Sequence, residues 1–149
     1  MYSLIFLDFD GVLIGDEARP NFPVRHLDPH NVAILNRLVK KTDARIVLVT
    51  AWRHPLGTTQ EIVDVLARDG LEDAQTRVIG QTRYLASSRA VEIGEWLITH
   101  QHPRTICILD DLPITGFLSQ FQVQTDPRVG LTAQNALKAA EMLKEAVGV

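Results

Sequence analysis

Cysteine and aromatic residues are scarce in this chain of 149 residues, which has one cysteine and 6% aromatic residues. The single cysteine, Cys107, lies in the apolar run Thr105–Leu109. No disulfide can therefore form within the chain, and a buried, inert thiol is the default expectation. No apolar stretch approaches the roughly 18 residues of a membrane-spanning helix, so no membrane partner is expected.

An excess of charge of one sign is also lacking. The net charge is −3 and the isoelectric point is about 5.9, so no overall basic field attracts nucleic acid or an anionic membrane. A local basic cluster is still compatible with these values. The amino terminus enters an apolar segment without a charged leader. With 46% apolar residues, we expect one soluble, cytoplasmic domain over residues 1–149.

The most informative segment is the apolar run Ser3–Leu7, which is followed by Asp8, Phe9, Asp10 and Gly11. Such a run is typical of a buried strand, whereas two carboxylates continue a strand poorly. Because side chains two residues apart in an extended chain lie on one side, Asp8 and Asp10 can converge on one point. Two carboxylates held close repel each other unless a cation or a shared proton offsets the charge. A surface turn that happens to contain Asp-X-Asp-Gly is the alternative.

Apolar runs alternate with helical periodicities along the rest of the chain, and no repeat or linker divides it. Residues 8–27 are rich in turn formers and predict a loop or flap. Asp28 before Pro29 predicts the start of a helix. We expect Val91, Trp96 and Leu97 to face the core. The expected strands are residues 3–7, 45–50, 77–80, 105–109 and 121–124, and the later helices are residues 58–69, 88–100 and 133–146.

This alternation predicts a three-layer α/β/α sandwich with a mostly parallel, five-stranded sheet covered on both faces. Sheets of this kind bind ligands beyond the carboxyl ends of their strands. The rule brings three polar groups to one edge of the sheet, namely Asp8 with Asp10, Thr50, and Asp110 with Asp111. Three such groups at one edge predict a functional site.

These residues resemble the motifs of the haloacid dehalogenase (HAD) superfamily of phosphohydrolases, which have a Rossmann-like fold. The first motif of that superfamily is an apolar strand ending in Asp-X-Asp-Gly. The second is a Ser or Thr that ends the next strand, and Thr50 matches it. The fourth is an acidic pair that ends a later strand, and Asp110 with Asp111 matches it. The resemblance covers essentially the whole chain.

The third HAD motif is a Lys or Arg upstream of the fourth. Lysine is absent between Lys41 and Lys138, so an arginine must serve. We choose Arg89, because it opens the helix before the fourth strand and would lie at the positive end of that helix. Arg83, in the preceding loop, is the alternative. A narrower resemblance, carried by residues 48–53, 89–97, 123–127 and 130–132, is to the small HAD domains of "Swiss Army Knife" RNA-repair proteins.

The superfamily resemblance implies a phosphatase that works through an aspartyl-phosphate. Asp8 would be the nucleophile, and Asp10 would protonate the leaving group and then activate water. Thr50 and Arg89 would hold phosphoryl oxygens, and Arg53 could hold a second phosphate of the substrate. The simpler alternatives are a helix-capping or strand-end role for the Thr50 hydroxyl and, for Arg89, a surface ion pair with Glu92.

The same resemblance implies a Mg²⁺ site built only from oxygen atoms. Its ligands would be Asp8, the main-chain carbonyl of Asp10 and one or both of Asp110 and Asp111, a donor set that suits this ion. The alternative is that Asp110 and Asp111 form a solvated strand end.

HAD proteins usually select substrates with an inserted cap domain, for which neither residues 8–27 nor residues 72–87 are long enough. The chain therefore resembles a capless member with an open site. An open site suits a bulky substrate such as a polynucleotide end. A phosphatase for a nucleotide or sugar phosphate would need a lid from a partner in a homo-oligomer. The third reading, a non-catalytic phosphate-binding module, fits poorly with an intact Asp8–Asp10 pair.

Overall fold

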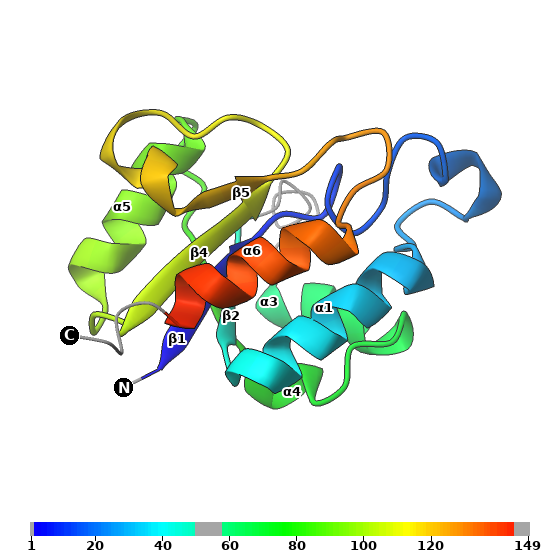
Figure 1. Cartoon of the computed structure of the whole chain (residues 1–149), viewed down its shortest axis with the longest axis horizontal. Coiled ribbons are helices and arrows are strands. Elements are labelled where there is room, and N and C mark those ends of the chain that lie inside the picture. The colour runs from blue at the N-terminus through cyan, green and yellow to red at the C-terminus, as the bar shows by residue number, and fades with distance from the viewer. Residues whose placement is uncertain (1, 50–57, 145–149) are drawn as a thin grey trace.

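The computed structural model describes residues 2–49 and 58–144. Five strands form one sheet in the order β3-β2-β1-β4-β5 (Figure 1). All neighbouring strands run parallel, which confirms the predicted α/β sandwich and makes the sheet entirely rather than mostly parallel. The strands are β1 (Ser3–Leu7), β2 (Arg45–Leu48), β3 (Val78–Gln81), β4 (Thr105–Asp110) and β5 (Gln122–Gln124).

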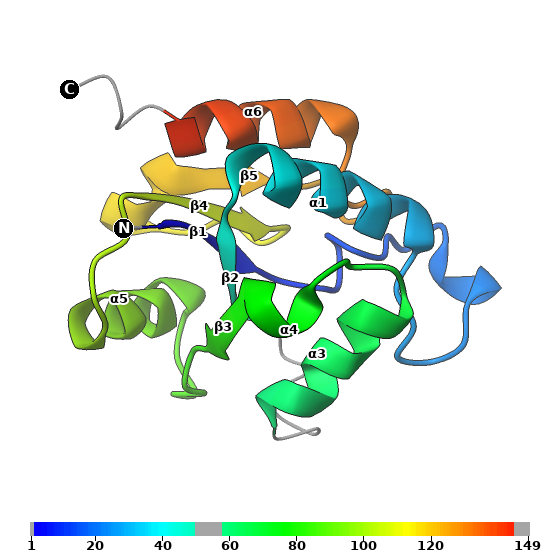
Figure 2. The ribbon, with the colours of Figure 1, turned by 90° about the horizontal axis from the view of Figure 1, so that it is seen from below.

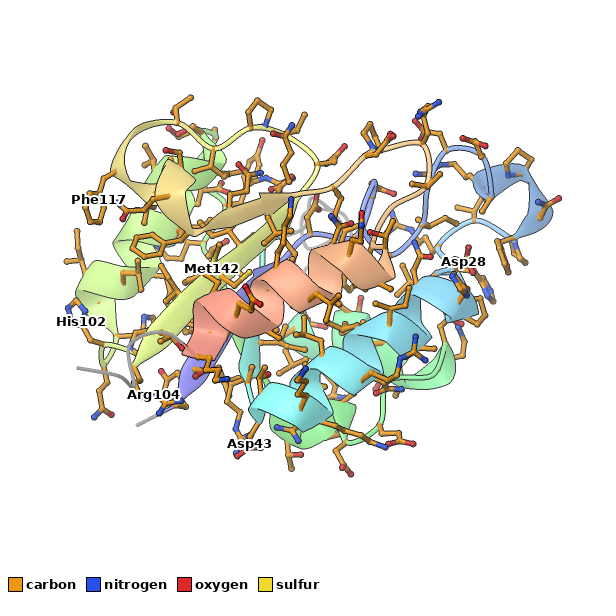
Figure 3. All side chains as sticks on the ribbon, in the orientation of Figure 1. Asp28, Asp43, His102, Arg104, Phe117 and Met142 are labelled. Carbon is orange, nitrogen blue, oxygen red and sulfur yellow. The ribbon has the colours of Figure 1, made fainter. Side chains whose placement is uncertain are left out.

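Helices cover both faces of the sheet. Figure 2 shows α1 (Pro29–Thr42) and α6 (Ala133–Lys144) on one face and α5 (Arg89–Thr99) on the other. The helices α3 (Thr59–Arg68) and α4 (Ala74–Arg77) contribute to the same apolar cluster as α1. The start of α1 is capped as expected, because the Asp28 side chain accepts a hydrogen bond from the His30 amide (Figure 3).

Strand β1 lies at the centre of the sheet, and all five of its residues are buried. Ile5 and Leu7 join the cluster beneath α1 and α6, whereas Leu4 and Phe6 join the cluster beneath α5. Burial on both faces explains why this strand is an unbroken apolar run. Cys107 in β4 is also fully buried, and burial raises the pKa of its thiol to about 12, so the predicted inert thiol is confirmed.

Two local expectations were wrong. Val91 is 51% exposed, whereas Ile93 and Trp96 are buried, because residues two apart on a helix lie on nearly opposite sides. Strand β3 begins at Val78 rather than at Arg77, because Arg77 ends the one-turn helix α4. The sequence pattern gives no sign of so short a helix.

No inserted domain occurs in the described residues between β1 and α1 or between β3 and α5. The first of these segments holds only the 3-10 turn η1 (Arg19–Asn21), and the second is the loop of residues 82–88, while a turn, α4 and β3 take up the rest of the range 72–87. The predicted absence of a cap is therefore confirmed at these two places. Within residues 2–49 and 58–144, every helix is too short or too polar to cross a membrane.

Candidate active site

Three carboxylates meet where β1 and β4 end. Leu7 of β1 pairs with Leu109 of β4, so the residues that follow them, Asp8 and Asp110, emerge side by side. Carboxylate oxygens of Asp8, Asp110 and Asp111 lie within 4.8 Å of one another. Asp8 is 3% exposed and Asp110 is fully buried. We call these three side chains the carboxylate cluster.

The guanidinium of Arg89 reaches the carboxylate cluster from the first turn of α5. Its Nη1 atom lies 2.9 Å from Asp110 Oδ2 and 3.5 Å from Asp8 Oδ1. Arg83 has a different environment, because it is 73% exposed and its Nε atom lies 3.3 Å from Glu95 Oε1. Of the two arginines considered from the sequence, the structure therefore brings Arg89 to the cluster.

The surroundings of α5 explain this orientation. The Ser88 hydroxyl caps the helix by accepting a hydrogen bond from the Val91 amide at 3.2 Å. Glu92, the acidic neighbour on the helix, is buried and accepts a hydrogen bond from the Leu85 amide at 3.1 Å. Arg89 consequently forms its ion pairs with the carboxylate cluster, and the alternative of a surface ion pair with Glu92 is not what the structure shows.

Among residues 2–49 and 58–144, one guanidinium faces the three carboxylates, which gives this part of the site an excess of negative charge. Burial raises the pKa of Asp8 to about 8, against the opposing effect of Arg89, and the charges of Asp110 and Asp111 raise it further. Burial likewise raises the pKa of Asp110 above its ordinary value, although Arg89 opposes this. A divalent cation among these oxygens would offset the repulsion, and an all-carboxylate donor set suits Mg²⁺. The residues therefore fit the metal that the sequence implied.

The raised pKa of Asp8 predicts how stability depends on pH. In the unfolded chain this carboxyl has its ordinary pKa near 3.8, whereas in the folded chain its pKa is about 8. The folded state binds the proton more tightly, so the contribution of Asp8 to stability is full below about pH 4 and is lost as the pH rises through about 8. In EDTA, the free energy of unfolding should fall less between about pH 5 and about pH 8 in Asp8→Asn than in the parent.

Denaturant titrations of both proteins at the two pH values measure this difference. Asp43→Asn is the matched control, because Asp43 is an exposed carboxylate whose pKa is lowered by Arg77 and which stays ionised over this range. The free energy of unfolding of this control should fall between the two pH values by as much as that of the parent. If the free energy of unfolding falls equally in all three proteins, the pKa of the Asp8 carboxyl is not raised in the folded state.

Asp10 lies near the carboxylate cluster in sequence but its carboxylate has a different partner. The side chain is 47% exposed, and its Oδ1 atom lies 3.1 Å from Arg19 Nη1. Arg19 belongs to η1 and also approaches Asp16 at 3.8 Å. The close group formed by Asp8, Asp110 and Asp111 does not include the Asp10 carboxylate, which is more open to solvent than the buried side chains of Asp8 and Asp110.

Gly11 completes the turn after β1 in a conformation that side chains disfavour. Its φ is +82°, and a Cβ atom at this position would lie 2.5 Å from Cγ of Asp111. The absence of a side chain thus lets the main chain of the first loop pack directly against the carboxylate of the other loop. This contact explains why a glycine follows the two aspartates.

Two residues proposed from the sequence, Thr50 and Arg53, lie outside the described residues. The strand that leads to Thr50 ends at the same edge of the sheet, because the amide of the buried Val49 donates to the Leu7 carbonyl at 2.9 Å.

Comparison with known proteins gives one family match. The family model described as "HAD domain in Swiss Army Knife RNA repair proteins" matches residues 4–136. The matched range runs from β1 into α6 and contains every residue of the carboxylate cluster, as well as Arg89. No curated protein and no solved structure matches the chain significantly.

Proposed function

Because the chain belongs to the family of HAD domains in Swiss Army Knife RNA repair proteins, we propose that it is a Mg²⁺-dependent phosphomonoester hydrolase with an aspartyl-phosphate intermediate. One observation carries the proposal: the buried carboxylates of Asp8 and Asp110 and the partly exposed carboxylate of Asp111 meet at the carboxyl edge of the sheet, with Arg89 beside them. A HAD domain with such a cluster indicates a phosphohydrolase in general terms. The metal, the intermediate and the substrate are the proposed parts.

In the first half of the proposed reaction, a carboxylate oxygen of Asp8 attacks phosphorus and the ester P–O bond breaks. Asp10 donates a proton to the leaving oxygen. Its half-exposed carboxylate, held by Arg19, is suited to exchange protons with solvent between steps. Arg89, together with Thr50, holds the phosphoryl oxygens, and its planar fork can bind two of them. The carboxylate cluster would hold the Mg²⁺ ion, whose positive charge would keep Asp8 ionised and offset the charge of the phosphoryl group.

In the second half, water attacks the phosphorus of the aspartyl-phosphate and the bond between phosphorus and the Asp8 oxygen breaks. Asp10 accepts the proton of the attacking water and is thereby restored to its acid form. The products are free phosphate and the original Asp8 carboxylate. The burial of Asp8 limits access of bulk water to this side chain, so the attacking water must arrive in place of the departed leaving group.

We propose a bulky substrate such as the phosphorylated end of a polynucleotide. The absence of a cap at the two described segments and the RNA-repair description of the family support this proposal. The competing candidate is a small-molecule phosphatase, with a nucleotide or sugar phosphate as its substrate and a lid from an oligomer partner. Turnover of a phosphorylated oligonucleotide, compared with a panel of phosphorylated metabolites, separates the two. Binding of phosphate without turnover would instead favour a non-catalytic module.

Metal removal should abolish activity. EDTA should stop hydrolysis of an aryl phosphate, and added Mg²⁺ should restore it, because the donors of the carboxylate cluster are all oxygen atoms and their excess charge needs a cation. Mg²⁺ should also raise the melting temperature of the chain, since a ligand that binds only the folded state stabilises it. Calorimetric titration with Mg²⁺ and a rate assay over a Mg²⁺ series measure both effects. Full activity in EDTA would overturn the metal-dependent mechanism.

A further inference from the structure

The edge strand β5 and the segment that follows it contact both loops that carry the carboxylates. It pairs with β4, and the segment after it, residues 125–131, runs beside the loop that follows β1 (Figure 1). The site as described draws no residue from β5. The sequence resemblance included residues 123–127 but gave them no role.

The loop after β4 is held by glutamine side chains of β5. Gln122 Nε2 donates to the carbonyls of Asp110 at 3.1 Å and Leu112 at 2.7 Å, and its Oε1 accepts from the Ile114 amide at 2.8 Å. Gln124 Nε2 donates to the Asp111 carbonyl at 3.1 Å. The main chain of the acidic pair is therefore fixed from the side of β5.

Thr125 joins this loop to the loop after β1. Its amide donates to the Asp110 carbonyl at 3.2 Å, and its hydroxyl donates to the Gly11 carbonyl at 2.6 Å. The residue is 3% exposed. A single buried residue thus connects the two motifs: its side chain bonds the turn of the first motif, 114 positions away in the sequence, and its main-chain amide bonds the acidic pair of the fourth.

The hydrogen bond to the Gly11 carbonyl bears on the site because Gly11 lies against the Asp111 carboxylate. The main chain of this glycine packs against the Asp111 carboxylate, and its amide donates to the Ile14 carbonyl at 2.9 Å. The Thr125 hydroxyl therefore holds the turn against Asp111. The peptide between Asp10 and Gly11, whose carbonyl was expected to be a metal ligand, is oriented by the same turn.

We propose that Thr125 is a positioning residue that sets the separation of the two carboxylate-bearing loops and thereby the affinity of the site for Mg²⁺. This inference rests on the proposed function. Thr125 contacts neither the metal nor the substrate in this role. It acts through the carbonyl oxygens of Gly11 and Asp110, much as hydrogen-bonding partners outside the ligand shell orient metal ligands in other proteins.

Two substitutions at this position separate the hydrogen bond from the bulk of the side chain. Thr125→Val keeps the shape and removes the donor, whereas Thr125→Ser keeps the donor and removes a methyl group. Mg²⁺ affinity measured by calorimetry should fall by about 10- to 100-fold in Thr125→Val, the range seen when such partners are removed. Thr125→Ser should keep most of the parental affinity. The Mg²⁺ concentration for half-maximal activity should rise in the valine variant, and excess Mg²⁺ should restore most of its turnover.

Thr105→Val is the matched control, because Thr105 is another buried threonine that joins distant segments. Its hydroxyl donates to the Leu143 carbonyl at 2.7 Å and forms a second hydrogen bond with the Ser3 hydroxyl, whose oxygen lies 2.8 Å away. Thr105 lies at the start of β4, next to Arg104 (labelled in Figure 3), whereas Asp110 of the carboxylate cluster is the last residue of the same strand. Thr105→Val should lower the melting temperature and leave Mg²⁺ affinity unchanged.

Gln124→Leu provides an independent variant if Thr125→Val does not fold, because Gln124 is an exposed residue that contacts only the Asp111 side of the site. It should weaken Mg²⁺ binding in the same direction but less. Parental Mg²⁺ affinity in a folded Thr125→Val protein would overturn the inference. If Thr125→Val does not fold, parental Mg²⁺ affinity in Gln124→Leu would overturn it. Equal weakening in Thr105→Val would do the same. A parent chain that binds no Mg²⁺ would instead remove the proposed function itself, and the inference with it.

Discussion

Replacement of Asp8 with asparagine should abolish hydrolysis of an aryl phosphate while the chain stays folded. The amide is a poor nucleophile, and in other covalent enzymes loss of the nucleophile lowers turnover by about four orders of magnitude or more. Asparagine has nearly the same shape, and its oxygen can still accept the hydrogen bond that the Phe9 amide gives to Asp8 Oδ1 at 2.8 Å. The side chain also lies beyond the end of β1 rather than among the apolar residues that hold the sheet.

Rate measurements at saturating Mg²⁺, with a melting curve of the same sample, test this prediction. Asp43→Asn is again the control, because Asp43 is an exposed aspartate at the end of α1, remote from the site (Figure 3). Its left-handed backbone suits asparagine, so the control should fold and keep full activity. Substantial turnover by a folded Asp8→Asn protein would eliminate the covalent mechanism.

Removal of Arg89 should have the second-largest effect. Arg89→Ala should lower kcat/KM. The loss of transition-state stabilisation should be about 2–4 kcal/mol, if the loss of Arg89 resembles that of an oxyanion-hole donor. A phosphoryl group beside several carboxylates needs cationic help beyond one metal ion, and the guanidinium already lies 2.9 Å from Asp110 Oδ2. Arg89→Lys should recover part of the loss, because lysine keeps the charge but cannot bind two oxygens with a planar fork.

Arg83→Ala is the natural comparison within the same chain. Arg83 is the other arginine near the start of α5, but it is exposed and pairs with Glu95. Its replacement should change kcat/KM little. Steady-state kinetics on the three variants decide the order of effects, and a larger loss for Arg83→Ala than for Arg89→Ala would transfer the phosphate-binding role to Arg83.

The parts of the site that follow strand ends could be predicted from the sequence. An apolar run fixes where a buried strand ends, and parallel strands bring their carboxyl ends to one edge, so Asp8 and Asp110 are expected to meet. Arg89 could be predicted as well, because no lysine is available and helix starts lie at that same edge. The meeting of Asp8 and Asp110 follows from periodicity and topology alone, whereas the choice of Arg89 also needs the HAD motif that asks for a Lys or Arg upstream of the acidic pair.

Other contacts had no signal in the periodicity. The pairing of Asp10 with Arg19 depends on the path of an irregular loop, and the bond from Thr125 to Gly11 joins side chain and main chain across most of the sequence. Hydrophobic patterning specifies which face of an element is buried, but not which polar groups meet between loops. The supporting contacts of the site were therefore visible only in three dimensions.

The central position of β1 has a consequence for how the chain assembles. Its neighbours, β2 and β4, are separated from it by long crossovers, so the sheet forms through contacts between residues far apart in sequence. Topologies of this kind fold slowly, because loops must close before strands can pair. The carboxylate cluster comes into being only when β4 has docked beside β1. A cation that binds there stabilises only the folded state in which β1 and β4 are paired. It should therefore slow unfolding rather than speed folding.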